Sequence, residues 1–161
     1  MRNAVEVGDF IVTIDNSGCI GEKPLDVVQT TNEITAYYTA RTAIIEQWCA
    51  GAMPVQLLMA NFTGDTAWED YVRGVTRVFE EIGEHVPPLT GSTESNFESQ
   101  QSAVALTMLG KRFFTPTKEG CRYFVIGMPL VGEEVLQHPK QVASLVELYP
   151  LLKNGVIQAI W

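Results

Sequence analysis

The chain has 161 residues, of which 46% are hydrophobic and 19% are charged, and its formal net charge is −8. This length and composition predict one soluble globular domain with a real core. No window of 18 apolar residues predicts a membrane span. The acidic balance, without clustered Lys or Arg, argues against nucleic acid as a partner. The first ten residues, "MRNAVEVGDF", lack the apolar core of a signal peptide, so we expect a cytoplasmic protein with no membrane partner.

The first half of the chain alternates between extended and helical patterns. Extended segments are predicted at 9–15 and 25–31. Apolar positions with helical spacing predict a helix over 34–50, ended by Gly51 as a C-terminal cap. Arg41 lies inside the apolar stripe of this helix, where a plain core helix would carry Leu.

The middle of the chain gives the clearest patterns. The apolar run 53–62 predicts a buried strand. The helix that follows is predicted to start at a capping box, "TAWE" at 66–69, and to end at Gly83. After a short strand in "HVPPL" and a polar loop, "SAVALTMLGKR" at 102–112 is apolar on both alternations, which predicts a central strand covered on both faces.

The last forty residues predict a strand at 121–130, a helical turn in "GEEVLQHP", a helix at 140–153 and a strand at 155–161. Pro150 is expected to break or kink that helix.

The order of elements, β, β, α, β, α, β, β, β, α, β, favours an α+β fold with a mixed sheet and helices on one face. It lacks the strict alternation of parallel units, and the chain has no GxGxxG or GxxxxGK[ST] motif. The other sheet face must be buried in another way, and a dimer that packs two such sheets together would bury it. A terminal strand with an exposed Trp161 is a poor end for a domain. We therefore expect one domain over 1–135, with 136–161 leading toward a missing or truncated second domain.

The few cysteines and histidines support neither a zinc site nor a catalytic site built on histidine. The three cysteines are far apart and show no metal-ligand spacing, so zinc is not supported and free thiols are expected. Near the two histidines, His85 and His138, the sequence shows no pattern typical of a catalytic nucleophile. A plain hydrolase that uses His85 is therefore the weakest of the functional hypotheses.

Four carboxylates stand at strand ends, in loops or off the apolar stripe of a helix: Asp15, Asp26, Glu46 and Glu94. Such positions present ligand groups, and Mg²⁺ prefers carboxylate oxygens with waters and phosphates as its other ligands. Taken singly, each has an ordinary alternative as a turn, cap or solvated residue. The functional interpretation requires that they converge.

The loop "LTGSTESNFESQQ" at 89–101 carries small and hydroxyl-bearing residues whose backbone can approach a phosphate closely. Lys23, Lys111 and Arg112 could meet phosphate oxygens from neighbouring turns. By composition alone the loop is a surface turn and these cations are solvated.

The ordered set "TARTAIIEQWCAGAMPVQLLMANF", a helix, and then "PLTGSTESNF" resembles the N-terminal domain of the AIR synthase-related (PurM-like) superfamily. The resemblance covers 9–135, and "DNSGCIGEKPLD" with "LTGSTESNF" is most similar to the alpha-ribazole kinase branch. It implies an enzyme that uses ATP and Mg²⁺ to form or break a phosphoryl bond. It also implies a homodimer whose sheets pair into a barrel, and a small-molecule substrate.

By position in this resemblance, Glu46 is the helix acid before "GA-x-P", and Asp15 is the early Asp after the first strand. We therefore expect Asp15, Asp26, Glu46 and Glu94 as metal ligands. We expect Thr90, Gly91, Ser92, Thr93 and Lys111 to contact the nucleotide phosphates. No catalytic residue is assigned.

The chain departs from the family pattern at two places. Ser92 replaces the acid of the Gly-rich loop, with Glu94 two residues on, and Asn32 is nearest to the Asp of the family's "T-D" segment. These changes keep an alternative open, namely a non-catalytic dimeric binding or regulatory domain that retains the fold without a functional metal site.

Overall fold

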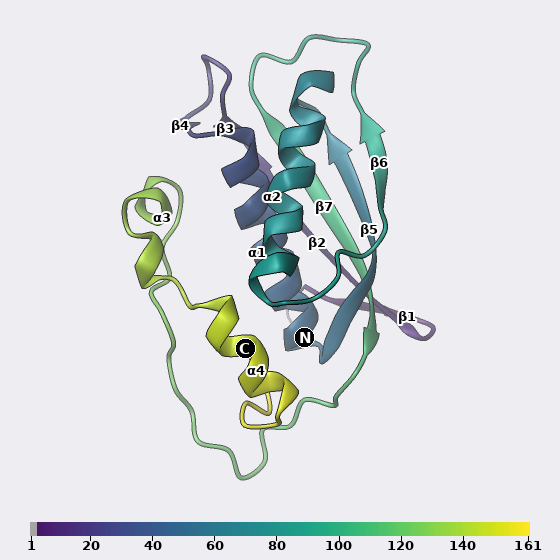
Figure 1. Ribbon diagram of the computed structural model, residues 1–161, viewed down its shortest axis with the longest axis vertical. Helices are drawn as coiled ribbons and strands as arrows, with labels where there is room; N and C mark the ends of the chain where they lie inside the picture. Colours follow the sequence, from purple (N-terminus) through teal and green to yellow (C-terminus); the bar gives the residue numbers. More distant parts are fainter. Residues whose placement is uncertain (1–2) are drawn as a thin grey trace.

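The protein folds into a five-stranded mixed sheet with two long helices packed against one of its faces, as the computed structural model of residues 3–161 shows (Figure 1). The strand order is β1-β2-β7-β5-β6, and all neighbours are antiparallel except the pair β5 and β6. This arrangement confirms the predicted α+β class. The strands are β1 (Val5–Val7), β2 (Phe10–Gly18), β5 (Ala52–Asn61), β6 (Leu89–Thr93) and β7 (Ala103–Arg112), and a separate parallel pair joins β3 (Ile20–Gly21) to β4 (Val28–Gln29).

Helix α1 (Asn32–Cys49) confirms the predicted helix and starts two residues earlier than expected. The Thr31 hydroxyl accepts a hydrogen bond from the Ile34 N–H (3.2 Å), which satisfies one free donor of the first turn. Past the other end, Gly51 takes φ 74°, a conformation that favours glycine. The buried Gln47 donates from Nε2 to the Met108 carbonyl (2.9 Å) and so ties α1 to β7.

Helix α2 (Trp68–Glu81) lies beside α1 and buries Tyr71, Val75, Val78 and Phe79. The predicted capping box is wrong, because no side chain within residues 3–161 caps this helix. The chain leaves β5 through Gly64, with φ 122°, and makes a 3₁₀ turn over Asp65–Ala67. Thr66 therefore lies inside that turn instead of preceding the helix.

The C-terminal third contains less regular structure than predicted. The expected strand at 121–130 is irregular backbone, and three of its large side chains, Tyr123, Phe124 and Val125, are 75%, 79% and 94% exposed. The expected strand at 155–161 is also absent among the described residues. Apolar and β-branched residues favour strands only where a sheet edge pairs with them, and here none does.

The last helices bring the chain back to the core. Helix α3 (Glu133–Gln137) occupies the predicted helical turn, and α4 (Leu145–Lys153) is shorter than the predicted helix and contains Pro150. Tyr149 of α4 stacks on the buried Trp48, with ring centroids 5.5 Å apart. The Tyr149 hydroxyl also donates to Glu84 (2.6 Å). The hydrophobic core therefore includes residues of α4.

Strand β7 is central, as predicted, but only one of its faces is covered. Val104, Leu106 and Met108 are buried under the helices, whereas Ala105 and Thr107 on the other face are only half-buried. The cross-strand register places several exposed apolar side chains on that second, uncovered face. They are Val5, Val7, Phe10, Ile14 and Leu58.

Candidate functional site

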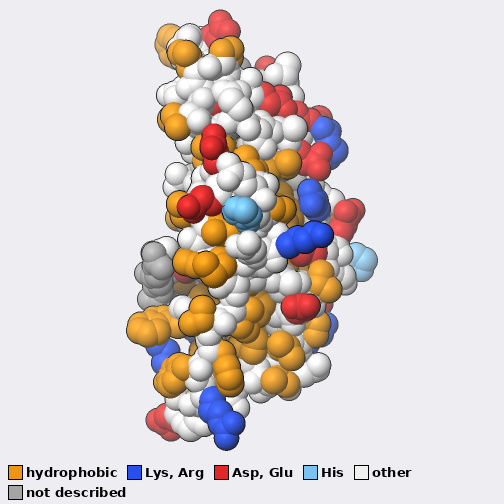
Figure 2. Space-filling model, turned by 90° about the vertical axis from the view of Figure 1, so that its left-hand side faces the viewer, with side chains coloured by type: hydrophobic (Ala, Val, Ile, Leu, Met, Phe, Trp, Pro, Cys, Tyr) orange, Lys and Arg blue, Asp and Glu red, His pale blue; other side chains and the backbone are white. Residues whose placement is uncertain are grey.

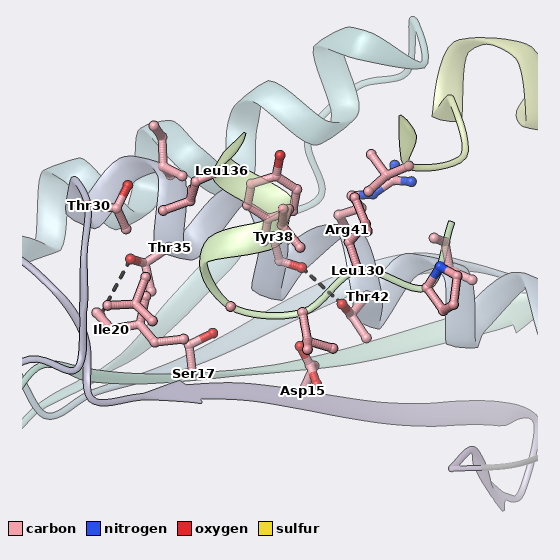
Figure 3. Close-up of a pocket in the computed structure, with 18 of the residues that line it drawn as sticks. Asp15, Ser17, Ile20, Thr30, Thr35, Tyr38, Arg41, Thr42, Leu130 and Leu136 are labelled. Atoms are coloured by element: carbon pink, nitrogen blue, oxygen red, sulfur yellow. Dashed lines mark hydrogen bonds between the residues drawn. The ribbon is translucent and has the colours of Figure 1, made fainter. Parts of the chain in front are cut away.

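A pocket of about 470 Å³ opens between α1, β2 and the segment 126–136, which runs into α3. Figure 3 shows polar side chains of α1 and β2 on one side of it and the 126–136 segment crossing the other. Its apolar wall comes from α1 and from the C-terminal segment alike. Its main polar residues are Asp15, Ser17, Thr35, Tyr38, Arg41 and Thr42.

Asp15 lies on β2 and belongs to the sheet face that carries the helices. Burial raises the pKa of its carboxyl, and the negative charge of Glu46 raises it further. Hydrogen bonding from the Asn16 backbone and the Thr42 hydroxyl opposes this shift but does not cancel it. The carboxylate of Asp15 is therefore held in a place that disfavours its charge.

Glu46 of α1 is the acidic residue whose charge acts on Asp15. Its Oε1 accepts a hydrogen bond from Asn3 Nδ2 (3.1 Å), while its Oε2 is buried without a hydrogen-bond partner among the described residues. An unsatisfied carboxylate oxygen beside a second acidic group is costly unless a cation or a donor completes it. The charge of Glu46 acts on Asp15, so the two carboxylates are near enough to influence each other, and such a pair fits Mg²⁺, which commonly uses one or two protein carboxylates.

Asp26 has a different environment. Its Oδ1 accepts from Ser102 N (2.7 Å), and its Oδ2 accepts from Ser102 Oγ (2.6 Å) and from Lys23 N (2.9 Å). The Cys19 N–H donates to the carbonyl of Ser102, the residue that Asp26 binds, so Asp26 lies near Cys19. Cys19 is four residues from Asp15, which is about 13 Å along an extended chain. In this structure, Asp26 fastens the β3–β4 loop to the start of β7.

We predict that Asp26→Asn lowers the free energy of unfolding by about 1–2 kcal/mol, because the amide nitrogen cannot accept from Lys23 N. Chemical denaturation measures this change. Nucleotide binding by the folded variant should match that of the wild type. A loss of Mg²⁺-dependent binding without a loss of stability would instead make Asp26 a metal ligand.

The predicted phosphate-contacting residues 90–93 form the edge strand β6 and not a loop. Gly91 lies in the same cross-strand row as Asp15, but three strands away, which is about 14 Å. Glu94 follows β6, and its Oε1 accepts from Asn96 N (2.7 Å). Residues 3–161 contain no group of three or more His, Cys, Asp or Glu side chains placed to hold a metal ion.

Lys111 lies near the C-terminal end of β7, and Asp26 binds at the N-terminal end of that strand. The Nζ of Lys111 is 5.6 Å from the centre of the Phe10 ring. The register places Lys111 on the uncovered sheet face, together with Thr90 and Ser92. Within one copy of the chain, these residues and Asp15 are on opposite faces of the sheet.

Ser17, Arg41 and Thr42 share the pocket with Asp15, and the sequence did not mark Ser17 or Thr42. The Ser17 hydroxyl makes a hydrogen bond with Thr39 Oγ1 (2.8 Å), and short polar residues of this kind are common in any chain. Arg41 did carry a signal, since a cation inside an apolar helical stripe is unusual.

A second hollow of about 740 Å³ lies between 117–126 and 156–161. Figure 2 shows this side of the molecule, where apolar side chains gather over the lower half. Most of its lining residues are apolar, and none of the lining residues in the described range is Asp or Glu. It therefore offers less for chemistry than the pocket at Asp15. None of the helices in the described range 3–161 is long and apolar enough to cross a membrane.

No protein-family model and no curated protein sequence matches this chain. Among solved structures, thiamine monophosphate kinase from Aquifex aeolicus is similar, with a TM-score of 0.52 and 16% identity over 76% of this chain and 40% of that one. AaThiL complexed with AMPPCP and TMP gives a TM-score of 0.58 and 12% identity over 94% of this chain and 55% of that one. Hydrogenase maturation protein HypE gives a TM-score of 0.52 and 14% identity over 95% of this chain and 52% of that one.

The chain has the PurM-like N-terminal-domain fold. It spans about half the length of these solved structures. At such low identity the similarity establishes the fold, and it assigns no residue a role. The expected fold is confirmed, whereas the alpha-ribazole kinase branch is not.

Proposed function

We propose that this chain is the nucleotide-binding domain of an ATP- and Mg²⁺-dependent phosphoryl-transfer enzyme. The observation that carries the proposal is that the charge of Glu46 acts on Asp15 at the pocket, while Glu46 Oε2 is buried without a partner among the described residues. The complex of the similar kinase with AMPPCP, an ATP analogue, supports the nucleotide. We expect this acidic chain to act in the cytoplasm.

In this proposal Asp15 and Glu46 hold Mg²⁺, which when bound neutralises phosphate charge. The protein's contribution is positioning and charge balance, as in other phosphoryl transfers. Thr42 and Asn3 hold the two carboxylates in place. Asp26 and Glu94 are less suited as ligands of the same ion, since each is engaged elsewhere.

The acceptor is proposed to be a small metabolite, and alpha-ribazole is one candidate that the sequence resemblance suggests. The pocket supports a molecule with an apolar body, because Ile34, Ile45, Leu130 and Leu136 are among its lining residues. The second domain that the sequence resemblance implies, and toward which 136–161 is expected to lead, would help to close over the substrates.

A second copy of the chain is proposed to cover the uncovered sheet face. Thr90, Ser92 and Lys111 lie on that face, opposite Asp15, so within one copy they point away from a nucleotide whose Mg²⁺ is held at Asp15 and Glu46. The exposed apolar residues Ile14 and Leu58 lie in one row across the same face.

We expect the wild type to be a homodimer and Ile14→Glu to be a monomer, because the substitution places a charge in the middle of the apolar face. Val27→Glu is the matched control, since Val27 is also exposed but lies outside the five-stranded sheet. Light scattering coupled to size exclusion measures the mass of each. A monomeric wild type would remove the dimer from the proposal.

The alternative is a non-catalytic binding or regulatory domain, which Ser92 and Asn32 favour as departures from the family pattern. In the structure Asn32 Nδ2 donates to Glu22 (3.1 Å), which is a structural contact at the start of α1. Thermal unfolding with ATP discriminates between the two functions. With Mg²⁺ and ATP at about 100 times Kd, the melting temperature should rise by about 5–10 °C. The same shift with and without Mg²⁺, or no shift, would favour the alternative.

A further inference from the structure

Arg41 is a buried cation without an ion pair. Its side chain lines the pocket, and the residue is only 7% exposed. Its hydrogen bond among the described residues goes from Nη2 to the backbone carbonyl of Ala143. No carboxylate within residues 3–161 lies within 4.0 Å of its nitrogens.

The acidic residues around Arg41 are engaged elsewhere. Glu81 of α2 accepts a hydrogen bond from the Tyr37 hydroxyl (2.7 Å) and forms no ion pair with Arg41. Asp15 lines the same pocket and is coupled to Glu46. Figure 3 shows Arg41 extending from α1 toward the C-terminal chain, away from Asp15.

The guanidinium of Arg41 carries five donors in a fixed fork, and only Nη2 has a hydrogen bond to the described residues, to the Ala143 carbonyl. None of its nitrogens is among the buried atoms that lack a partner within residues 3–161, so its other donors remain accessible to a ligand in the pocket. A residue that only filled the apolar stripe of α1 would be better served by an aliphatic side chain. The position therefore has the properties of an anion-binding site, since Arg binds carboxylate and phosphate groups through two parallel hydrogen bonds.

We propose that Arg41 binds the oxyanion group, phosphate or carboxylate, of a small molecule whose apolar body fills the pocket against Ile34, Ile45 and Leu136. This makes the acceptor of the phosphoryl transfer an anionic molecule, a step that rests on the proposed function. The oxyanion site itself does not depend on ATP or Mg²⁺.

Phenyl phosphate, phenylacetate and benzyl alcohol test the site by calorimetry in the absence of ATP and Mg²⁺. They share a ring that fits an apolar pocket, and they carry a phosphate, a carboxylate or no charge. We expect the two anions to bind more tightly than the alcohol. Arg41→Met, which keeps the aliphatic stem, should weaken the anions by about 10–100-fold and leave the alcohol unchanged. Arg112→Met removes a cation outside this pocket and should change none of the three.

Two further readouts separate this role from others. A ligand-binding Arg41 predicts that Arg41→Met keeps or raises the melting temperature, whereas a purely structural one predicts a fall. Mg²⁺-dependent ATP binding should survive the substitution. Equal anion binding by the wild type and Arg41→Met, or no binding by the wild type, would overturn the oxyanion site. Loss of ATP binding in Arg41→Met would assign Arg41 to the nucleotide and overturn the acceptor assignment.

If Arg41→Met does not fold, a measurement on the wild type still tests whether Arg41 binds the oxyanion. The ¹⁵N signal of the Arg41 Nε–H group, assigned with Arg41→Lys, should shift when phenyl phosphate is added and stay in place when benzyl alcohol is added. A signal whose chemical shift changes with neither compound would contradict the proposal.

Discussion

Asp15→Asn is expected to abolish Mg²⁺-dependent ATP binding and to make the unliganded protein more stable. Burial and the charge of Glu46 both raise the pKa of the Asp15 carboxyl, so its charged form is disfavoured in the fold. Asn removes that charge at nearly the same size. Because even outer groups around a metal change affinity by about 10–100-fold, loss of a direct ligand should cost about 100-fold or more.

The sign of the pH dependence follows from the direction of the shift. The folded protein retains the Asp15 proton above the ordinary pKa of 3.8, where the unfolded chain has released it. Between these two pKa values stability therefore falls as pH rises, and the contribution of Asp15 is unfavourable above both. Denaturation of the wild type and Asp15→Asn at several pH values should show a difference that grows with pH and then levels off.

Asp9→Asn is the matched control, because Asp9 is exposed in the turn between β1 and β2. It should alter neither stability nor ATP binding. If Asp15→Asn instead lowers the melting temperature while ATP binding persists, Asp15 is a structural residue and the proposed metal site is wrong.

The second large effect is expected for Gly74→Ala at the contact of α1 and α2. A Cβ at residue 74 would overlap the Glu33 carbonyl oxygen and lie 2.8 Å from Tyr37 N and 2.9 Å from Ala36 Cβ. Ala is favoured over Gly in a helix by about 1 kcal/mol. Backbone atoms of α1 cannot move aside as a flexible side chain would, so the clash should prevail.

We expect Gly74→Ala to lower the free energy of unfolding by about 2–3 kcal/mol and the melting temperature by about 5–10 °C. Glu80→Ala on the same helix is exposed and should stay within about 0.5 kcal/mol of the wild type. A stabilised Gly74→Ala would show that α1 and α2 lie further apart than in this structure.

Local patterns in the sequence were sufficient for the elements that form the core. The helical spacing over 34–50 predicted α1, and the apolar runs at 53–62 and 102–112 predicted β5 and β7. Each of these segments buries a continuous set of its own side chains, so its periodicity reflects its environment.

The failures arose where distant contacts decide the structure. The 121–130 segment has the composition of a strand but no strand beside it, and the 66–69 pattern is overridden by the turn at Gly64. The sequence indicated Asp15 and Glu46 as separate candidates, and only the packing of α1 on β2 shows that the charge of Glu46 acts on Asp15. The order of the strands in the sheet places Gly91 three strands away from Asp15.

The most direct test of the shared carboxylate site is calorimetric titration of ATP, with and without Mg²⁺, into the wild type, Glu46→Gln and Glu69→Gln. Glu69 is an exposed carboxylate on α2 and serves as the control. The proposed site predicts Mg²⁺-dependent binding to the wild type and Glu69→Gln that is lost or strongly weakened in Glu46→Gln. Equal binding by all three proteins, or binding that ignores Mg²⁺, would contradict it.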